Sequence, residues 1–337
     1  MIPSAENQVA PMLAKAVATV PTAGNLLFEP KWDGFRAIVY IDNGRVEIGS
    51  RGSKSLTRYF PEIVDAVASQ IHGTRVLDGE IVVRAGSAGS ERLDWEALSA
   101  RIHPAESRVQ KLSVETPASF VAFDLLAIDG ESLLDRPFRD RRAALETIEL
   151  AAPLHRSQVT TDATLAERWL VEFEGAGLDG VIAKPLDAVY SPDKRVMLKV
   201  KHHRTADVVL LGYRVHKSGA GVGSLLLGLY DGAGELQNVG GVSALTDKRR
   251  LELVDELAPL VTGTGERERT RFSSGKDLGF VTLDPSRVLE VRYDQMEGAR
   301  FRHTVQFERW RPDRDPHSCT FEQLEVPAKY DLATVLS

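Results

Sequence analysis

Cysteine is almost absent from this chain, because Cys319 is the only one among its 337 residues. A single cysteine excludes disulfides within the chain and any zinc site built from several cysteines. We expect Cys319 to be a small, semi-buried structural residue. This composition favours a protein of the reducing cytoplasm.

Long apolar runs are also missing. No stretch approaches the roughly 20 apolar residues that a membrane-spanning helix needs, so no membrane partner is expected. The N-terminus shows no basic segment followed by an apolar core, and we therefore expect no secretory signal. These features predict a cytoplasmic protein rather than a secreted or membrane protein, and we expect it to be a monomer.

An excess of positive charge is lacking too. Lysine and arginine number 42 against 48 aspartates and glutamates, which gives a formal net charge of −6. This balance argues against nucleic-acid binding through overall charge, but binding depends on where the charges sit. Two stretches, residues 199–204 and 300–314, are locally basic. A length of 337 residues with 43% hydrophobic content predicts two globular domains.

The most informative stretch that is present is Glu-Pro-Lys-Trp-Asp-Gly-Phe-Arg at residues 29–36. Lys31 can attack a nucleotide phosphorus only as a neutral amine, so neighbouring cations or desolvation must lower its pKa. Asp33 and Gly34 predict a tight turn that holds the lysine at the rim of a pocket. Arg36 offers a planar donor fork.

Two lysines later in the chain fit the same phosphate-transfer chemistry as Lys31. Lys199 and Lys201 alternate along a predicted strand, so both side chains point to one face. From that face they can neutralise a phosphate and lower the pKa of Lys31. An exposed strand face is the structural alternative for this pair.

The coarse secondary structure changes after about residue 204. Before it we expect a hairpin over 37–48 with its turn at Asn43-Gly44, helices from Pro61 and over 165–173, a flexible loop at 85–90, and strands at 180–183 and 196–200. After it come strands at 207–213, 223–230, 236–242 and 288–293. A helix over 246–257 should carry Leu251 and Val254 on one face. Short strands with one helix predict an oligonucleotide-binding barrel, the OB-fold.

Further short motifs follow the lysine motif in order, and together they resemble the ATP-dependent DNA ligases. The resemblance extends to the compact two-domain bacterial type called LigC and to the ligase module of LigD. It implies an α+β chain: an adenylation (nucleotidyltransferase) domain of antiparallel sheets and helices at 1–203, followed by a C-terminal OB-fold β-barrel domain at 204–337. The motifs are Ser50-Arg51-Gly52, Leu77-Asp78-Gly79-Glu80, residues 120–126, residues 178–184, residues 198–201 and Arg311-Pro312-Asp313-Arg314.

The resemblance implies a role for each matched residue. Lys31 would carry AMP, and the other residues would bind ATP. Glu29 would read the adenine amino group, Glu80 the ribose, and Phe123 would stack on adenine. The remaining cations are expected on ribose, adenine or phosphates: Arg36, Arg51, Lys184, Lys199 and Lys201, with Arg311 and Arg314 on the leaving pyrophosphate.

The resemblance also implies a divalent cation, Mg²⁺ or Mn²⁺, held by Asp179 and Glu80. The family usually has glutamate where this chain has Asp179, and the shorter side chain still offers a carboxylate to a hard cation. Each assignment has a structural alternative: a turn for Asp179, core packing for Phe123, and salt bridges for Arg36 and Arg51.

The implied activity is the sealing of 5′-phosphate/3′-hydroxyl nicks through lysyl-AMP and DNA-adenylate, in DNA repair, recombination or replication. Nicked double-stranded DNA would be the substrate, with a repair polymerase or a DNA end-binding protein as a candidate partner. Alternatives are an RNA ligase, an mRNA-capping type of nucleotidyltransferase, or a nonenzymatic nucleic-acid-binding protein with a decayed ligase domain. The intact lysines argue against decay.

Overall fold

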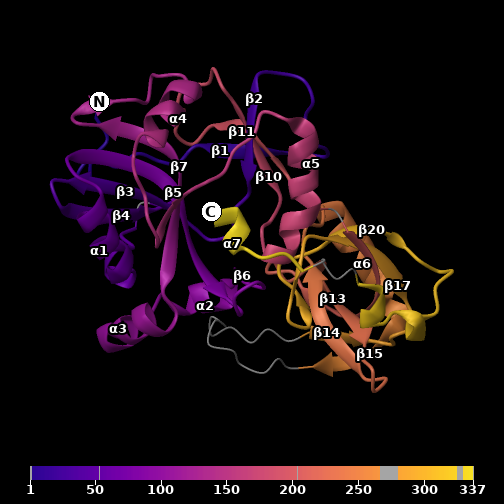
Figure 1. Cartoon of the computed structure of the whole chain (residues 1–337). Coiled ribbons are helices and arrows are strands. Elements are labelled where there is room, and N and C mark those ends of the chain that lie inside the picture. The colour runs from indigo at the N-terminus through magenta and orange to yellow at the C-terminus, as the bar shows by residue number, and fades with distance from the viewer. Residues whose placement is uncertain (1, 53, 203, 266–279, 325–328, 337) are drawn as a thin grey trace. The chain divides into compact units, whose positions relative to one another are not determined.

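The structure, a computed structural model, describes residues 2–52, 54–202, 204–265, 280–324 and 329–336 (Figure 1). The chain forms two compact units. Unit 1 consists of Met1–His202 together with Pro327–Ser337, and unit 2 of His203–Val326. The sequence-based division, at 203/204, matches the first of these boundaries closely. It assigned the C-terminal residues to the second domain, however, whereas they group with unit 1.

Unit 1 contains two sheets. The smaller sheet has the order β1-β11-β10-β2, in which β1 and β11 run parallel and the other pairs antiparallel. The larger sheet has the order β4-β3-β5-β7-β8, with β6 paired to β5 and β9 paired to β7. The strands are β1 (Leu13–Val17), β2 (Leu26–Pro30), β3 (Phe35–Asp42), β4 (Arg45–Ser50), β5 (Thr74–Ala85), β6 (Arg92–Leu93), β7 (Ala118–Ile128), β8 (Glu131–Ser132), β9 (Leu154–Arg156), β10 (Val181–Pro185) and β11 (Arg195–Val200).

The predicted local signals in unit 1 are confirmed. Asn43 and Gly44 both have positive φ, at 48° and 91°, as a two-residue type I′ hairpin turn between β3 and β4 requires. Pro61 occupies the first turn of its helix, where its missing N–H costs nothing. The helices are α1 (Pro61–Gln70), α2 (Trp95–Ala100), α3 (Glu106–Glu115), α4 (Phe138–Glu146), α5 (Ala163–Glu172) and the C-terminal α7 (Ala333–Leu336).

Unit 2 is built mainly of antiparallel strands. Its main sheet has the order β14-β13-β12-β16-β15, and β17 pairs with both β12 and β20. The strands are β12 (Arg204–Val215), β13 (Val222–Tyr230), β14 (Leu236–Val242), β15 (Val261–Gly265), β16 (Phe280–Leu283), β17 (Val288–Tyr293), β18 (Met296–Glu297), β19 (Arg300–Phe301) and β20 (Gln306–Trp310). The four strands predicted after residue 204 correspond to β12, β13, β14 and β17.

The helix of unit 2, α6 (Asp247–Leu257), begins one residue after the predicted start, and the side chain of its N-cap, Thr246, accepts a hydrogen bond from the Arg249 N–H. Its predicted apolar face was partly wrong. Leu251 is 57% exposed, whereas Leu253 and Leu257 are buried in the core of unit 2. The i, i+4 pair of leucines therefore faces the sheet. Cys319 is also completely buried there, as a small core residue.

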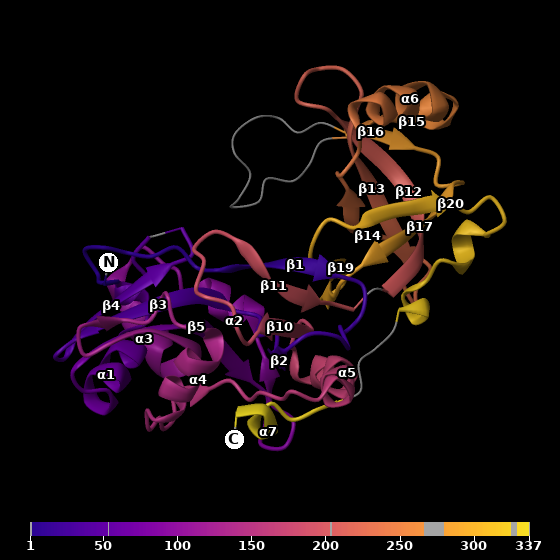
Figure 2. The same cartoon turned by 90° about the horizontal axis from the view of Figure 1, so that it is seen from above.

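The C-terminal residues pack into unit 1, which the sequence analysis missed. Leu332, Val335 and Leu336 join the apolar cluster that contains Trp32 and Phe123. Backbone and side-chain hydrogen bonds hold this segment: the Leu332 N–H donates to the Glu91 carbonyl at 2.9 Å, and the Glu91 N–H donates to the Asp331 side chain at 3.1 Å. Figures 1 and 2 both show α7 among the elements of unit 1.

Because Leu332 is fully buried, we predict that Leu332→Ala lowers the free energy of unfolding of unit 1 by about 2–5 kcal/mol. Denaturation followed by tryptophan fluorescence measures this, since Trp32 and Trp169 lie in the same apolar cluster. Leu251→Ala is the matched control at an exposed position, and it should change stability by less than about 0.5 kcal/mol. Equal effects of the two substitutions would contradict the structural role of the tail.

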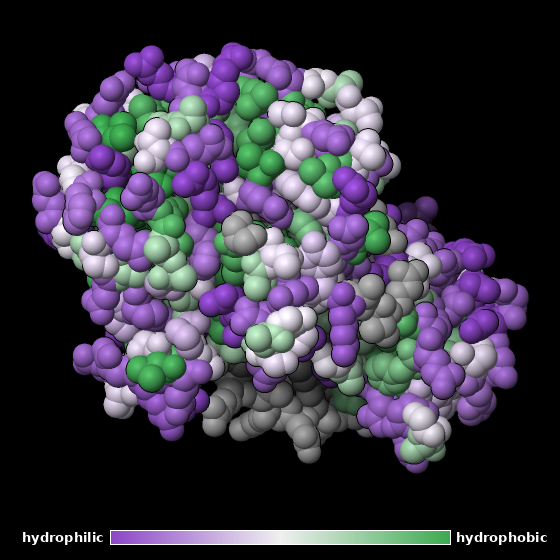
Figure 3. Space-filling model, in the orientation of Figure 1, coloured by the Kyte–Doolittle hydropathy of each residue, from purple (hydrophilic) through white to green (hydrophobic). Residues whose placement is uncertain are grey.

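The surface of the molecule mixes hydrophobic and hydrophilic residues (Figure 3). On the face seen in Figure 3, hydrophobic residues form small groups separated by hydrophilic ones. None of the helices in the described part of the chain is long and apolar enough to cross a bilayer.

Candidate active site

One pocket in unit 1 gathers most of the predicted site residues. Both sheets contribute to it, because Glu29, Ile182 and Lys199 are register partners across β2, β10 and β11, while Arg36 and Glu80 are register partners across β3 and β5. Opposed residues of paired strands share one face. The predicted residues that line the pocket are Glu29, Lys31, Arg36, Arg51, Glu80, Phe123, Lys184 and Lys199.

Lys31 lies directly after β2, in an irregular segment that backbone hydrogen bonds hold in place. The Lys31 N–H donates to the Gly180 carbonyl at 2.8 Å, and the Asp179 N–H donates to the Lys31 carbonyl at 3.0 Å. Gly180 has a φ of 127°, and a Cβ there would lie 2.0 Å from the Val200 carbonyl oxygen. Only glycine fits this position, so the two motifs are locked together by main-chain contacts.

Asp179 bridges two of the lysines. Its Oδ2 lies 2.5 Å from Lys31 Nζ and 3.0 Å from Lys201 Nζ, and Asp179 is only 8% exposed. Burial alone would raise the pKa of Asp179, but the two ammonium groups lower it below its ordinary value. Lys199 lines the pocket nearby. Burial and the charges of Lys31 and Lys201 lower the pKa of Lys199.

Glu29 and Lys184 form a buried ion pair at the pocket wall, with Lys184 Nζ 2.6 Å from Glu29 Oε1. Both side chains are almost fully buried, and burial raises the pKa of Glu29 despite the charge of Lys184. The second oxygen, Oε2, is buried without a hydrogen-bond partner among the described residues. An orphan carboxylate oxygen in a pocket wall is suited to accept a hydrogen bond from a ligand.

Arg36 is held by a residue that the sequence analysis did not assign. Its Nε and Nη2 pair with both oxygens of Asp78 at 2.6 and 2.7 Å. The Tyr190 hydroxyl donates to Asp78 Oδ2 at 2.7 Å and accepts from the Met12 N–H at 3.1 Å. Burial alone would lower the pKa of Arg36, but Asp78 raises it overall. The salt-bridge alternative for Arg36 is therefore realised, inside the pocket wall.

Two cations cover the ring of Phe123. The Arg36 guanidinium carbon and Lys184 Nζ each lie 4.4 Å from the ring centroid. Glu80 completes this part of the pocket, where its Oε1 accepts a hydrogen bond from the Gly34 N–H at 3.2 Å. Burial raises the pKa of Glu80 to about 7, against the lowering effect of Arg36 and Lys31. Arg51 is an exposed residue of the pocket lining.

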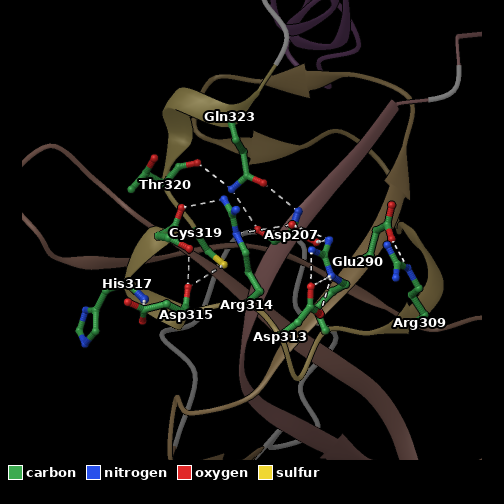
Figure 4. Close-up of polar contacts among 12 residues, drawn as sticks. Asp207, Glu290, Arg309, Asp313, Arg314, Asp315, His317, Cys319, Thr320 and Gln323 are labelled. Atoms are coloured by element: carbon green, nitrogen blue, oxygen red, sulfur yellow. Dashed lines mark hydrogen bonds and ion pairs between the residues drawn. The ribbon is translucent and has the colours of Figure 1, made fainter.

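Arg311 and Arg314 belong to unit 2, where they form a polar cluster of their own (Figure 4). Arg311 Nη1 lies 2.9 Å from each carboxylate oxygen of Asp207, and Arg314 Nε lies 3.6 Å from Asp207 Oδ2. Of the basic stretch at 199–204, the structure describes every residue except His203.

The sequence analysis also missed the apolar walls of the pocket. Met12, Ile182 and Met197 line it together with the charged residues. Strand alternation could have identified Met197 and Ile182, since they lie two residues before Lys199 and Lys184, respectively. The pocket lining thus combines cationic and apolar side chains.

Comparisons with known proteins agree with this geometry. A family described as "ATP dependent DNA ligase domain" matches residues 11–201, and one described as "ATP dependent DNA ligase C terminal region" matches residues 218–314. The chain is 54% identical over 337 residues to DNA ligase C1 of Mycolicibacterium smegmatis and 51% identical over 352 residues to DNA ligase C of Mycobacterium tuberculosis. In both comparisons 97% of each chain is covered.

More distant matches cover parts of larger proteins or show the fold alone. The chain is 33% identical to a "Multifunctional non-homologous end joining DNA repair protein LigD" of Mycobacterium tuberculosis, over 92% of this chain and 39% of that protein. A solved structure titled as a study of Lig E DNA ligases is 16% identical with a TM-score of 0.59, and covers 90% of this chain and 99% of that one. These matches confirm the expected α+β domain followed by an OB-like domain.

Proposed function

The chain belongs to the ATP-dependent DNA ligases, and on this premise we propose that Lys31 is the residue that accepts AMP. The observation that carries the proposal is the placement of Lys31 in a pocket that Lys199 also lines, with Asp179 in direct contact with both Lys31 and Lys201. The RNA-ligase, capping and nonenzymatic alternatives are set aside, because the family matches cover both units.

In the first step, Lys31 Nζ attacks the α-phosphorus of ATP. The N–P bond forms while the bond to pyrophosphate breaks, and Nζ loses a proton. In the second step, a 5′-phosphate oxygen of the nick attacks the same phosphorus, which restores the free lysine. In the third step, the 3′-hydroxyl attacks the activated 5′-phosphate, so that the strand is sealed and AMP leaves. Lys199 and Lys201 supply positive charge where negative charge develops.

We propose that the adenosine half of ATP binds against the apolar side chains of the pocket lining. Glu29 Oε2 would accept a hydrogen bond from the adenine amino group, which supports ATP over GTP, because guanine carries a carbonyl oxygen at that position. Phe123 would stack on the base after Arg36 or Lys184 leaves its ring, with Ile182 and Met197 as apolar neighbours. Glu80 would bind the ribose, and Arg51 a phosphate.

A divalent cation, Mg²⁺ or Mn²⁺, fits the carboxylates of Asp179 and Glu80. The described residues include no group of three or more metal-binding side chains. Mg²⁺, however, is commonly held by one or two carboxylates together with substrate phosphates. Glu80, whose pKa is about 7, would gain a counter-charge by such binding. When bound, the cation would neutralise phosphate charge.

Arg311 and Arg314 are proposed to orient pyrophosphate as the leaving group. We predict that Arg311→Ala and Arg314→Ala each slow adenylation of the enzyme by about 10-fold to 100-fold, since charge-assisted contacts to the leaving group are lost. Sealing of a pre-adenylated nick should change by less than about two-fold, because pyrophosphate takes no part in that step. Single-turnover assays of both reactions measure this, and equal damage to both would refute the specific role.

Nicked double-stranded DNA is the substrate that the family implies, and we propose that this enzyme acts in DNA repair. The 33% identity to a protein named for end-joining repair supports this role. A repair polymerase or a DNA end-binding protein is a candidate partner, and the cytoplasmic nucleoid the expected location. Unchanged survival of a strain lacking this gene after DNA strand breakage would argue against the repair role.

A further inference from the structure

The guanidinium group of Arg311 is held from two sides. Its Nη1 end lies 2.9 Å from both carboxylate oxygens of Asp207. Its side-on edge, formed by Nε and Nη2, pairs with Asp313 at 2.9 Å from each nitrogen. Every nitrogen of this arginine therefore has an anionic partner. A phosphate could bind Arg311 only by replacing one of these carboxylates.

The two carboxylates differ in their surroundings. The Asp207 side chain is 14% exposed, whereas the Asp313 side chain is 62% exposed. Exposed ion pairs contribute about 0–1 kcal/mol, whereas removal of one partner from a buried pair costs several kcal/mol. Asp313 is therefore the partner that an incoming anion replaces most easily. Asp207 stays in place, and it also attracts Arg314, whose Nε lies 3.6 Å from its Oδ2.

Asp207 is itself fixed by Gln323. At this point β12 pairs with β17 on one side, where Asp207 lies opposite Glu290, and β13 begins to pair with β12 only at Val209. The other edge of β12 is closed by a side chain: the Asp207 N–H donates to Gln323 Oε1 at 2.8 Å, and Gln323 Nε2 donates to the Asp207 carbonyl at 3.0 Å. The Gln323 side-chain amide thus forms the two hydrogen bonds that the backbone of a neighbouring strand would otherwise form with Asp207.

Gln323 is held in turn. Its Nε2 also donates to the Thr320 carbonyl at 2.9 Å, in the segment that contains buried Cys319. The Tyr230 N–H donates to the Cys319 carbonyl at 2.9 Å, which ties this segment to β13. The chain of contacts therefore runs from the barrel through Gln323 and Asp207 to the two arginines.

We propose that Asp207 is a positioning residue for the adenylation step, fixed by Gln323, and that Asp313 occupies the edge of Arg311 that the leaving pyrophosphate takes. The inference rests on the proposed role of Arg311 and Arg314 in that step. Asp207 holds Arg311 with its side-on edge outward, and this edge forms two parallel hydrogen bonds with a carboxylate or a phosphate. Pre-oriented donors avoid the cost of ordering the side chain during the reaction.

The two aspartates provide a matched test, because Asp207→Asn and Asp313→Asn each remove one negative charge from the same cluster. The measurements are single-turnover adenylation with ATP, reversal of the adenylated enzyme by inorganic pyrophosphate, and sealing of a pre-adenylated nick. We expect Asp207→Asn to slow adenylation and its reversal by about 10-fold to 100-fold, as loss of a buried charged partner predicts. Sealing should change less than about two-fold.

Asp313→Asn should have the opposite effect and favour the reaction with pyrophosphate. It removes the competing carboxylate, so the pyrophosphate concentration that half-saturates reversal should fall by about 2-fold to 5-fold. A change of both variants in the same direction would mean that only the net charge of the cluster matters, and would overturn the proposal. Glu290→Gln is the control, since Glu290 lies opposite Asp207 but pairs with Arg309 at 2.6 Å, and it should leave all three reactions unchanged.

Gln323→Leu changes no charge and therefore tests the positioning of Asp207 separately. Thermal melting shows whether Asp207→Asn folds normally. If Asp207→Asn folds poorly, Gln323→Leu still tests the proposal. It should slow adenylation by about 3-fold to 10-fold, because it leaves two backbone groups of Asp207 without partners. If adenylation stays normal in both Asp207→Asn and Gln323→Leu while Arg311→Ala and Arg314→Ala lose it, the positioning role alone is wrong. If the two arginine variants are also normal, both the inference and the proposed function of the arginines fail.

Discussion

Lys31→Ala should abolish the covalent capture of AMP. Removal of the nucleophile leaves no group in the pocket that can replace it, because Lys199 and Lys184 lie on other strands and Lys184 is paired with Glu29. We expect adenylation to fall by at least about 1,000-fold, as is typical when a nucleophile is deleted. Intact mass spectrometry after incubation with ATP and Mg²⁺ or Mn²⁺ measures the added mass of one AMP.

The same variant separates the steps of the reaction. Lys31→Ala should retain part of its ability to seal a nick that already carries AMP, since the lysine is not the nucleophile in that step. Lys111→Ala is a suitable control, because Lys111 is 58% exposed on α3 and forms an exposed pair with Glu115. Retention of labelled AMP by Lys31→Ala, or its loss in the control, would contradict the assignment of the nucleophile.

Asp179→Ala should have the second largest effect and slow adenylation by about 100-fold or more. An effect of this size is expected when a charge that organises a phosphoryl-transfer site is removed. Asp179 contacts Lys31 and Lys201 at once, so its removal leaves two neighbouring ammonium groups without their common partner. Both contacts reach Asp179 through Oδ2, and a cation in the proposed site would bind this same carboxylate.

Asp179→Glu tests the metal role. It restores the residue usual in the family, so it should retain activity but shift the balance between Mg²⁺ and Mn²⁺, since Mg²⁺ demands near-ideal octahedral geometry. Metal titrations of activity, together with Mn²⁺ binding in the presence of a non-hydrolysable ATP analogue, measure the shift. Unchanged titration curves and unchanged Mn²⁺ binding in both variants would identify Asp179 as a structural turn residue.

Much of the site could be predicted from sequence because its chemistry depends on short motifs. Lys31 and Lys199 were predicted from local patterns, and Glu80 and Phe123 from the resemblance to the ligases. The structure brings all four to one pocket. The contacts that hold these residues were not predictable in the same way. Asp78 and Tyr190 are 112 residues apart, and no local pattern pairs them.

The same distinction applies to the fold. Periodicity and turn residues determined the hairpin at Asn43-Gly44, the start of α1 at Pro61 and the strands of unit 2, because these depend on backbone preferences of adjacent residues. The apolar face of α6 was misjudged at Leu251, since only the position of the neighbouring sheet decides which side of a helix is covered.

The sequence by itself determined the family and the order of the two domains, and it predicted the nucleophile, because each is encoded in motifs whose residues are close along the chain. Only the tertiary structure decided that the C-terminal residues pack into unit 1, and that Asp207 and Gln323 support the arginines of the last motif. Both depend on contacts between residues more than 100 positions apart. Such contacts leave no local trace, since many apolar or polar residues could satisfy them equally well before the chain folds.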